Sequence, residues 1–214
     1  MNKRFEIRVD NLEKAHFEGV GNYDIPMIQP KVADYAINTK WIPFNYVSSY
    51  KGIPANIGVH FFIHDYQFRR IWNTPDSYIE RLKKFRYVCS PEFSVYNNMP
   101  RAMQIYNHYR KHWLGAYLQH KGVNIIPTIT WGLPQTFSFV FDGEPVGTIV
   151  AISGVGCTGT NDERDIFFMG YEAMKERLRP SVILFNGSIP DEIKDEVQPM
   201  ERAYQLFGTK KKAF

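Results

Sequence analysis

The stretch that most constrains the fold is residues 99–132. Its first part carries apolar residues at spacings of three and four, which is the pattern of one face of an α-helix: Ala102, Ile105, Tyr106, Tyr109, Trp113, Ala116 and Tyr117. Gly122 follows this pattern and can adopt the left-handed conformation that ends a helix. The apolar run after it predicts a buried strand ending at Thr130 and Trp131, with Pro127 marking a strand end, edge or bulge. The stretch is therefore a helix-then-strand unit.

Similar units lie on both sides of it. Apolar runs predict strands over residues 42–47, 58–63, 86–89, 148–153 and 181–185. Amphipathic patterns predict two short helices within 66–85, broken at 73–76, and one helix over 164–179. Strands that are apolar along their whole length and alternate with helices indicate a mainly parallel sheet covered on both faces. We therefore predict an α/β fold of repeated βα units, partial or minimal TIM-barrel-like, with an open doubly wound sheet as the alternative.

Length and composition predict one globular domain. A chain of 214 residues can bury a core without metal or disulfide staples, so we expect a single α/β domain over 1–214, with an irregular N-terminal segment 1–40 and a polar C-terminal tail 190–214. No run has the length of a signal peptide or of a membrane span, which predicts a cytoplasmic protein without a membrane partner. The net charge of +4 permits contact with nucleic acid without arguing for it.

Ligands bind beyond the carboxyl ends of the strands in both architectures. This rule selects the polar or functional residues that follow the apolar runs: Asn45, His64, Asp65, Ser90, Glu92, Ser94, Thr130, Trp131, Ser153, Cys157, Asn186 and Ser188. Asp65 and Glu92 are the catalytic candidates, as a carboxylate pair for acid–base chemistry. Alternatively, each caps the helix that follows it. His60 and His64 lie four residues apart beside Asp65, but no third ligand has a suitable spacing, so we predict buried, hydrogen-bonded histidine and no metal site.

A glycine-rich loop over residues 154–159 follows the strand predicted at 148–153. Such a loop ahead of a helix can offer backbone amides to a phosphate, but it can equally be a tight turn. A dinucleotide site is less well supported, because the next strand ends in Asn186 and not in an acidic residue. Cys157 would be a nucleophile activated by the helix start, or a small packed thiol.

Basic residues fall mostly off the apolar stripe of the central helix: Arg101, His108, Arg110, Lys111, His112 and Lys121. This pattern predicts a solvated helix face, or alternatively a surface for nucleic acid. No recognised nucleic-acid-binding module accompanies it.

Four segments together resemble an uncharacterised family: VHFFIHDYQFRRIWNTPDSYIERLKKFRYVCSPEFSVYNNMP, YNHYRKHWLGAYLQHKG, IIPTITWG and VAISGVGC. The family is domain of unknown function 4417, found in phages, prophages and mobile elements of Firmicutes, and the resemblance covers about residues 42–186. The family usually has SPDFS where this chain has SPEFS at residues 90–94, a change that retains the carboxylate and lengthens its reach. The resemblance implies a phage or mobile-element accessory protein acting in the host bacterial cytoplasm. It attaches no activity, so it assigns no catalytic residue.

Two functional hypotheses follow. In the first, the chain is an enzyme or binder of a nucleotide or phosphosugar, with Asp65 and Glu92 as catalytic residues. Its ligand-binding residues would be Asn45, His64, Ser94, Trp131, Gly154, Gly156, Cys157 and Asn186. In the second, it is a non-enzymatic protein that binds host protein or DNA, for replication control or evasion of defence. The sequence identifies no cofactor.

Overall fold

A computed structural model describes residues 9–30, 39–156 and 159–203 of the chain. The fold is mixed α/β, with a four-stranded and a three-stranded parallel sheet. The prediction of βα units with mainly parallel strands is confirmed. Cys157 and the lysines at 210–212 lie outside the described residues.

The first sheet has the strand order β3-β4-β5-β6, so its strands follow the chain order. Its strands are β3 (Lys40–Pro43), β4 (Ile57–His60), β5 (Tyr87–Cys89) and β6 (Ile125–Ile126). Helices α1 (Asp65–Asn73) and α2 (Asp76–Leu82) connect β4 to β5, and α3 (Arg101–His120) connects β5 to β6. α3 ends as predicted, because Gly122 adopts a φ of +89° just beyond it.

The second sheet has the order β7-β8-β9. β7 (Ile149–Ser153) and β8 (Val182–Asn186) are joined by α4 (Asn161–Leu178). The third strand, β9 (Gln198–Pro199), lies in the stretch that the sequence predicts as a polar tail. Val197 and Met200 flank β9 and are buried, so part of this stretch belongs to the core.

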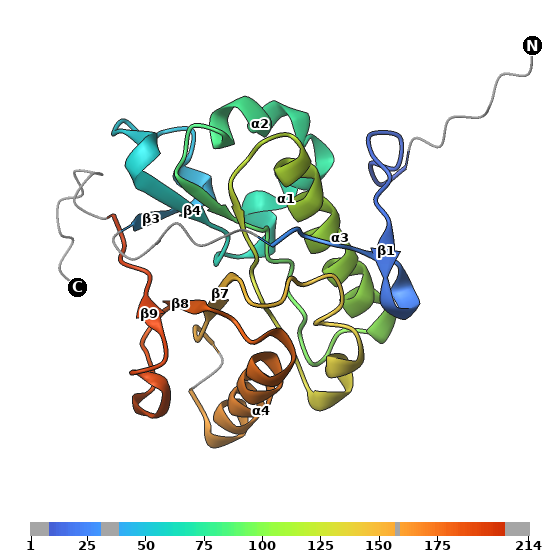
Figure 1. Ribbon diagram of the computed structural model, residues 1–214, viewed down its shortest axis with the longest axis vertical. Coiled ribbons are helices and arrows are strands. Elements are labelled where there is room, and N and C mark those ends of the chain that lie inside the picture. The colour runs from blue at the N-terminus through green and yellow to red at the C-terminus, as the bar shows by residue number, and fades with distance from the viewer. Residues whose placement is uncertain (1–8, 31–38, 157–158, 204–214) are drawn as a thin grey trace, which may run out of the picture.

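The fold also contains a short hairpin and several 3-10 helices. A hairpin of β1 (Gly19–Val20) and β2 (Ile25–Pro26) packs beside α3 (Figure 1). Single 3-10 turns occur at Gly21–Tyr23, Phe44–Tyr46, Pro54–Asn56, Pro134–Ser138 and Asp191–Ile193. The strand predicted over 42–47 is therefore wrong in its second half, which is a 3-10 turn.

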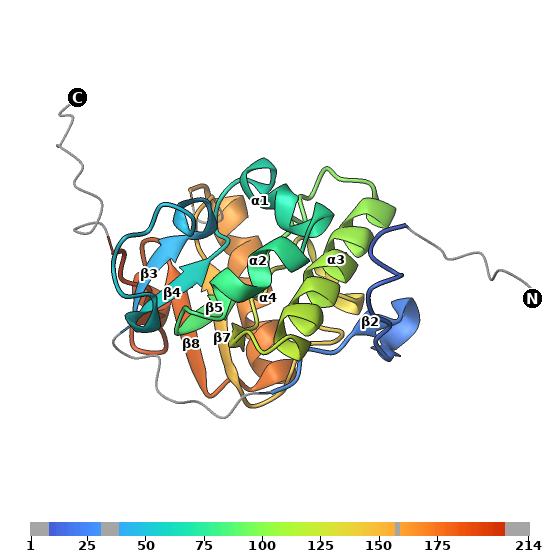
Figure 2. The ribbon, with the colours of Figure 1, turned by 90° about the horizontal axis from the view of Figure 1, so that it is seen from above.

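Helices α1, α2 and α3 gather on one side of the strands and α4 on the other (Figures 1 and 2). One buried cluster fills the space between the first sheet and α1–α3, and another lies between the second sheet and α4. A third cluster draws residues from strands of both sheets, including Trp41, Tyr87, Ile126, Ala151 and Leu184.

The two sheets meet at isolated bridges. Thr128 pairs with Ala151 next to β6 and β7, and Trp41 pairs with Arg202 next to β3 and β9, both in parallel orientation. Continuous ladders divide the strands into two sheets, and only isolated bridges link them in the described residues. A closed TIM-like barrel is thus not established by regular strand pairing.

Candidate functional site

A cavity of about 770 Å³ lies beyond the carboxyl ends of four parallel strands. It is lined by segments that follow β4, β5, β6 and β7 and by the first turns of α4: Phe62, Ile63, His64, Gln67, Glu92, Ser94, Val95, Tyr96, Asn97, Asn98, Ile129, Thr130, Trp131, Gly132, Ser153, Val155, Gly156, Glu163, Ile166 and Phe167. This is the edge where a parallel sheet covered by helices places its ligands. Of the residues selected from the sequence, the cavity brings together His64, Glu92, Ser94, Thr130, Trp131, Ser153 and Gly156.

Glu92 lines the cavity and has a shifted pKa. Burial raises the pKa of its carboxyl from 4.5 to about 7, against the lowering effects of a hydrogen bond with the Thr130 side chain and of the Lys111 charge. The nearby Asp65 charge raises the pKa further. A carboxyl with a pKa near neutrality can donate or accept a proton at physiological pH. No helix begins at Glu92, since α3 starts at Arg101, so the capping alternative is wrong for this residue.

Asp65 has a different role from Glu92. Its Oδ1 accepts a hydrogen bond from Ser94 Oγ at 2.7 Å, and its Oδ2 accepts one from the Ser94 amide at 3.2 Å. Asp65 is the first residue of α1 and does not line the cavity. Both of its oxygens therefore hold the segment that carries Glu92, and Asp65 acts as a positioning residue.

Helix α3 holds the same segment from its other side. Gln104 Nε2 donates to the Tyr96 carbonyl at 2.7 Å, and Asn107 Nδ2 donates to the Ser94 carbonyl at 2.7 Å. Asn97 Oδ1 in turn accepts from the Leu133 amide at 3.0 Å, which joins the segment to the one that carries Trp131. The loop at this edge is thus fixed by side chains that the strand-end rule does not select.

Trp131 forms part of the aromatic wall of the cavity. Its ring packs against Phe167 with 5.5 Å between centroids. Only a glycine fits at position 170 of α4, because a Cβ there would lie 2.1 Å from Trp131 Cδ1. The indole is half-buried, packs against α4 and lines the cavity, where an aromatic ring can stack on a flat ligand.

The glycine-rich loop is only partly in the cavity. Gly156 lines it with a φ of +74°, whereas Gly154 does not line it and packs against the Phe185 ring. Asn186 is buried beneath the loop, where its Nδ2 donates to Ser153 Oγ at 3.1 Å. It therefore orders the loop and is not placed to contact a ligand.

The remaining polar residues considered from the sequence, Asn45, His60 and His64, do not lie together in the structure. Asn45 lies exposed in a 3-10 turn and outside the cavity lining, contrary to the prediction. His60 is buried with its Nδ1 accepting from the Phe62 amide at 3.2 Å, and burial lowers its pKa to about 3. His64 is exposed outside β4, so the two histidines do not share a strand face. Within the described residues no cluster of ligating side chains could hold a metal ion.

Three of the basic residues of α3 are buried, contrary to the predicted solvated face. Lys111 and His112 are fully buried and both contact Glu144 Oε1, at 2.5 Å from Lys111 Nζ and 3.0 Å from His112 Nε2. His108 is also fully buried, with its Nε2 3.0 Å from the Asp142 carbonyl. These three residues form neither a solvated face nor a nucleic-acid surface, because the N-terminal segment and the loop around Glu144 cover them.

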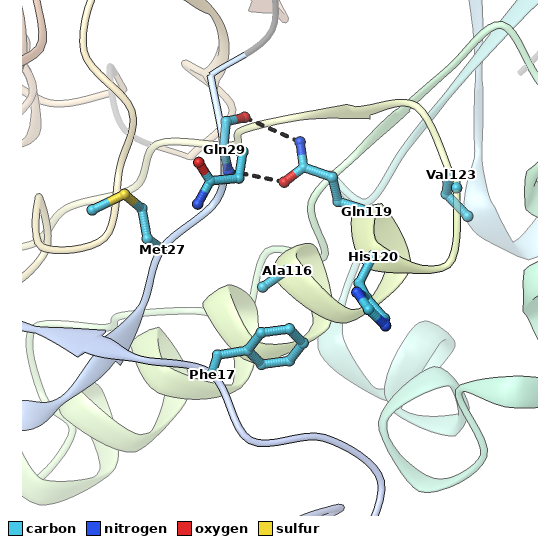
Figure 3. A pocket seen from close by; sticks show the side chains of 8 residues that line it. Phe17, Met27, Gln29, Ala116, Gln119, His120 and Val123 are labelled. Atoms are coloured by element: carbon cyan, nitrogen blue, oxygen red, sulfur yellow. Dashed lines mark hydrogen bonds between the residues drawn. The ribbon is translucent and has the colours of Figure 1, made fainter.

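A second hollow, of about 590 Å³, lies between the N-terminal segment and the end of α3 (Figure 3). Gln119 closes one side of it by a paired contact with Gln29. Its Oε1 accepts from the Gln29 amide at 2.8 Å and its Nε2 donates to the Gln29 carbonyl at 3.0 Å. Phe17 and Met27 supply apolar surface, and His120 is the titratable side chain of its described lining. No carboxylate is among these described lining residues, unlike the lining of the cavity around Glu92.

Several lining residues have no signal in the sequence. Glu163 belongs to the capping box of α4, and Asn98 and Gln67 belong to segments whose apolar pattern does not mark a strand end. The rule that polar residues follow strands does find Thr130 and Ser153. Side chains that reach the cavity from helices can be found only once the packing of those helices is known.

The fold and the cavity define an α/β protein with a pocket at the strand carboxyl ends. The family described as Domain of unknown function (DUF4417) matches residues 17–205, and the chain belongs to this family. It is 35% identical over 175 residues to the Gene 1 protein of Mycobacterium phage L5, covering 81% of this chain and 75% of that protein. It is 32% identical over 180 residues to the Gene 1 protein of Mycobacterium phage D29, covering 81% of this chain and 63% of that protein. No solved structure matches the chain.

None of the helices within the described residues combines enough length with enough apolar character to span a membrane.

Proposed function

We propose that this protein binds a small molecule with a base or sugar ring, of the nucleoside, nucleotide, sugar or phosphosugar type, in the cavity at the strand ends and acts on it by proton transfer through Glu92. The observation that carries this proposal is a carboxyl with a pKa of about 7 that lines a cavity of about 770 Å³ beside the Trp131 ring. Perturbed titratable groups in concave sites are candidates for catalysis.

The surroundings of Glu92 support an acid–base role. Thr130 forms a hydrogen bond with the carboxylate, and the buried charge of Lys111 favours its ionised form. Asp65 and Asn107 hold Ser94, two residues further along, so the loop that carries Glu92 has a fixed path. Trp131 would bind the flat face of a base or sugar ring next to the carboxyl.

The experiment is a thermal-shift panel on the purified protein with nucleosides, nucleotides, sugars, phosphosugars and short DNA and RNA. A ligand that binds the native state raises the melting temperature. We expect a shift with one small-molecule class that survives in Trp131→Phe, which retains an aromatic ring, and is lost in Trp131→Ala. In an otherwise wild-type protein, Glu92→Gln should retain binding of that ligand and lose the ability to convert it. A shift with DNA alone that disappears at high salt would contradict the proposal and support the non-enzymatic alternative.

We infer that the two sheets form one minimal TIM-like barrel and one domain, in which β9 lies next to β3. The Trp41 amide donates to the Glu201 carbonyl at 2.8 Å, and the Ile129 amide donates to the Ala151 carbonyl at 2.9 Å, across the two junctions between the sheets. The core cluster shared by both sheets supports the same arrangement.

The biological setting is proposed from the relatives. Two similar proteins are encoded by mycobacteriophages, which supports a phage or mobile-element accessory protein that acts in the cytoplasm of a bacterial host.

A further inference from the structure

The cavity has acidic residues on its walls. Glu92 and Glu163 both line it, and none of its described lining residues is a lysine or an arginine. The other polar lining groups include the amides of Asn97, Asn98 and Gln67. A phosphate ester bears one or two negative charges, so it is repelled by the Glu163 carboxylate and, above the pKa of about 7, by that of Glu92.

Two cations on the neighbouring helix α3, Lys111 and Arg110, are already engaged. Lys111 Nζ is fully buried and lies 2.5 Å from Glu144 Oε1 and 3.0 Å from the Thr128 carbonyl. The Arg110 guanidinium lies 3.9 Å from the centre of the Phe93 ring and donates to Asn107 Oδ1. Neither residue lines the cavity, so neither is placed to neutralise a phosphate there.

The start of α4, which the sequence suggests as a phosphate site, is also occupied. Thr160 Oγ1 accepts from the Glu163 amide at 3.2 Å, and Glu163 Oε2 accepts from the Thr160 amide at 2.9 Å. This capping box satisfies the backbone amides of Thr160 and Glu163, and the first turn adds the carboxylates of Asp162 and Glu163. A phosphate at this helix start would meet negative charge.

The walls do suit an uncharged ring that bears hydroxyl groups. Phe62, Tyr96, Trp131 and Phe167 supply aromatic surface, and carboxylate and amide oxygens can accept hydrogen bonds from hydroxyls. We infer that the site selects a neutral hydroxyl-bearing ring, a nucleoside or a free sugar, and discriminates against the phosphate ester of the same ring. This inference rests on the proposed function and narrows its ligand class.

Isothermal titration calorimetry with matched pairs tests the inference on the whole chain. The pairs are the four ribonucleosides with their monophosphates, and ribose and glucose with their phosphate esters. We expect one uncharged member to bind at least about tenfold more tightly than its ester, a difference of the size that a like charge in the same cavity produces. Binding in the nucleoside series would identify a nucleoside as the ligand, and binding in the sugar series would identify a free sugar.

A charge variant identifies the cause of the preference. Glu163→Gln removes one wall charge while glutamine can still complete the capping box, so the preference should fall several-fold. Glu176→Gln makes the same change at an exposed position of α4 outside the cavity and should leave the preference unchanged. An ester that binds as tightly as its parent ring, or a preference unaffected by Glu163→Gln, overturns the inference and leaves the proposed function standing. Absence of binding by every member of both series overturns the proposed function as well.

Discussion

Replacement of Glu92 by glutamine should change how the stability of the protein depends on pH. In the folded protein the pKa of Glu92 is raised from 4.5 to about 7, mainly by burial, so the ionised form is disfavoured in the native state. Between these two pH values the folded protein holds a proton that the unfolded chain has released. Stability from this group therefore falls as pH rises through that window.

The magnitude follows from the size of the change in pKa. A rise from 4.5 to about 7 corresponds to about 3 kcal/mol of unfolding free energy, and screening by water in the cavity reduces this to about 2 kcal/mol. Glutamine has the same shape and no charge, so Glu92→Gln avoids this cost. Relative to the wild type, the variant should gain about 2 kcal/mol as pH rises from about 5 to about 8.

The assay is urea denaturation of both proteins across this range, with the difference in unfolding free energy plotted against pH. His60 titrates in this range in the unfolded chain, because burial lowers its pKa in the folded protein to about 3. This makes stability rise with pH, but both proteins share that contribution. Glu176→Gln, an exposed substitution of the same type, should show a flat difference. A flat difference for Glu92→Gln would refute the assignment of a raised pKa to this carboxyl.

Two further predictions concern the packing. In urea denaturation, Lys111→Met should lower the unfolding free energy by about 3–5 kcal/mol, because it leaves the Glu144 carboxylate buried without its cation. The double variant with Lys111→Met and Glu144→Leu should recover part of that loss. Equal losses in the single and double variants would contradict this account. In hydrogen exchange, the Trp41 and Ala203 amides should be as protected as those of the β7–β8 ladder, because they donate hydrogen bonds across the junction of the sheets. Rapid exchange of these two amides would argue against a closed barrel.

The order and type of the main elements follow from the sequence. The spacing of apolar residues predicts α3, the strand that becomes β6 and the stop at Gly122, because a helix and a strand each impose their own period on a buried face. The same pattern places Glu92 and Trp131 after strands, and the common direction of parallel strands brings their ends to one edge. The sequence therefore predicts that Glu92 and Trp131 lie at one edge of the sheet, and both line the cavity there.

Tertiary packing decided the rest. Lys111 and His112 lie off the apolar stripe of α3, yet they are buried because segments distant in sequence, around Pro26 and Glu144, fold over that face. β9 consists of two residues whose strand conformation depends on pairing with β8. The pKa of Glu92 is likewise set by its burial and by Thr130, Lys111 and Asp65, which come from three other segments. Periodicity records which residues of one element share a face, whereas burial and electrostatics depend on what other elements place against that face.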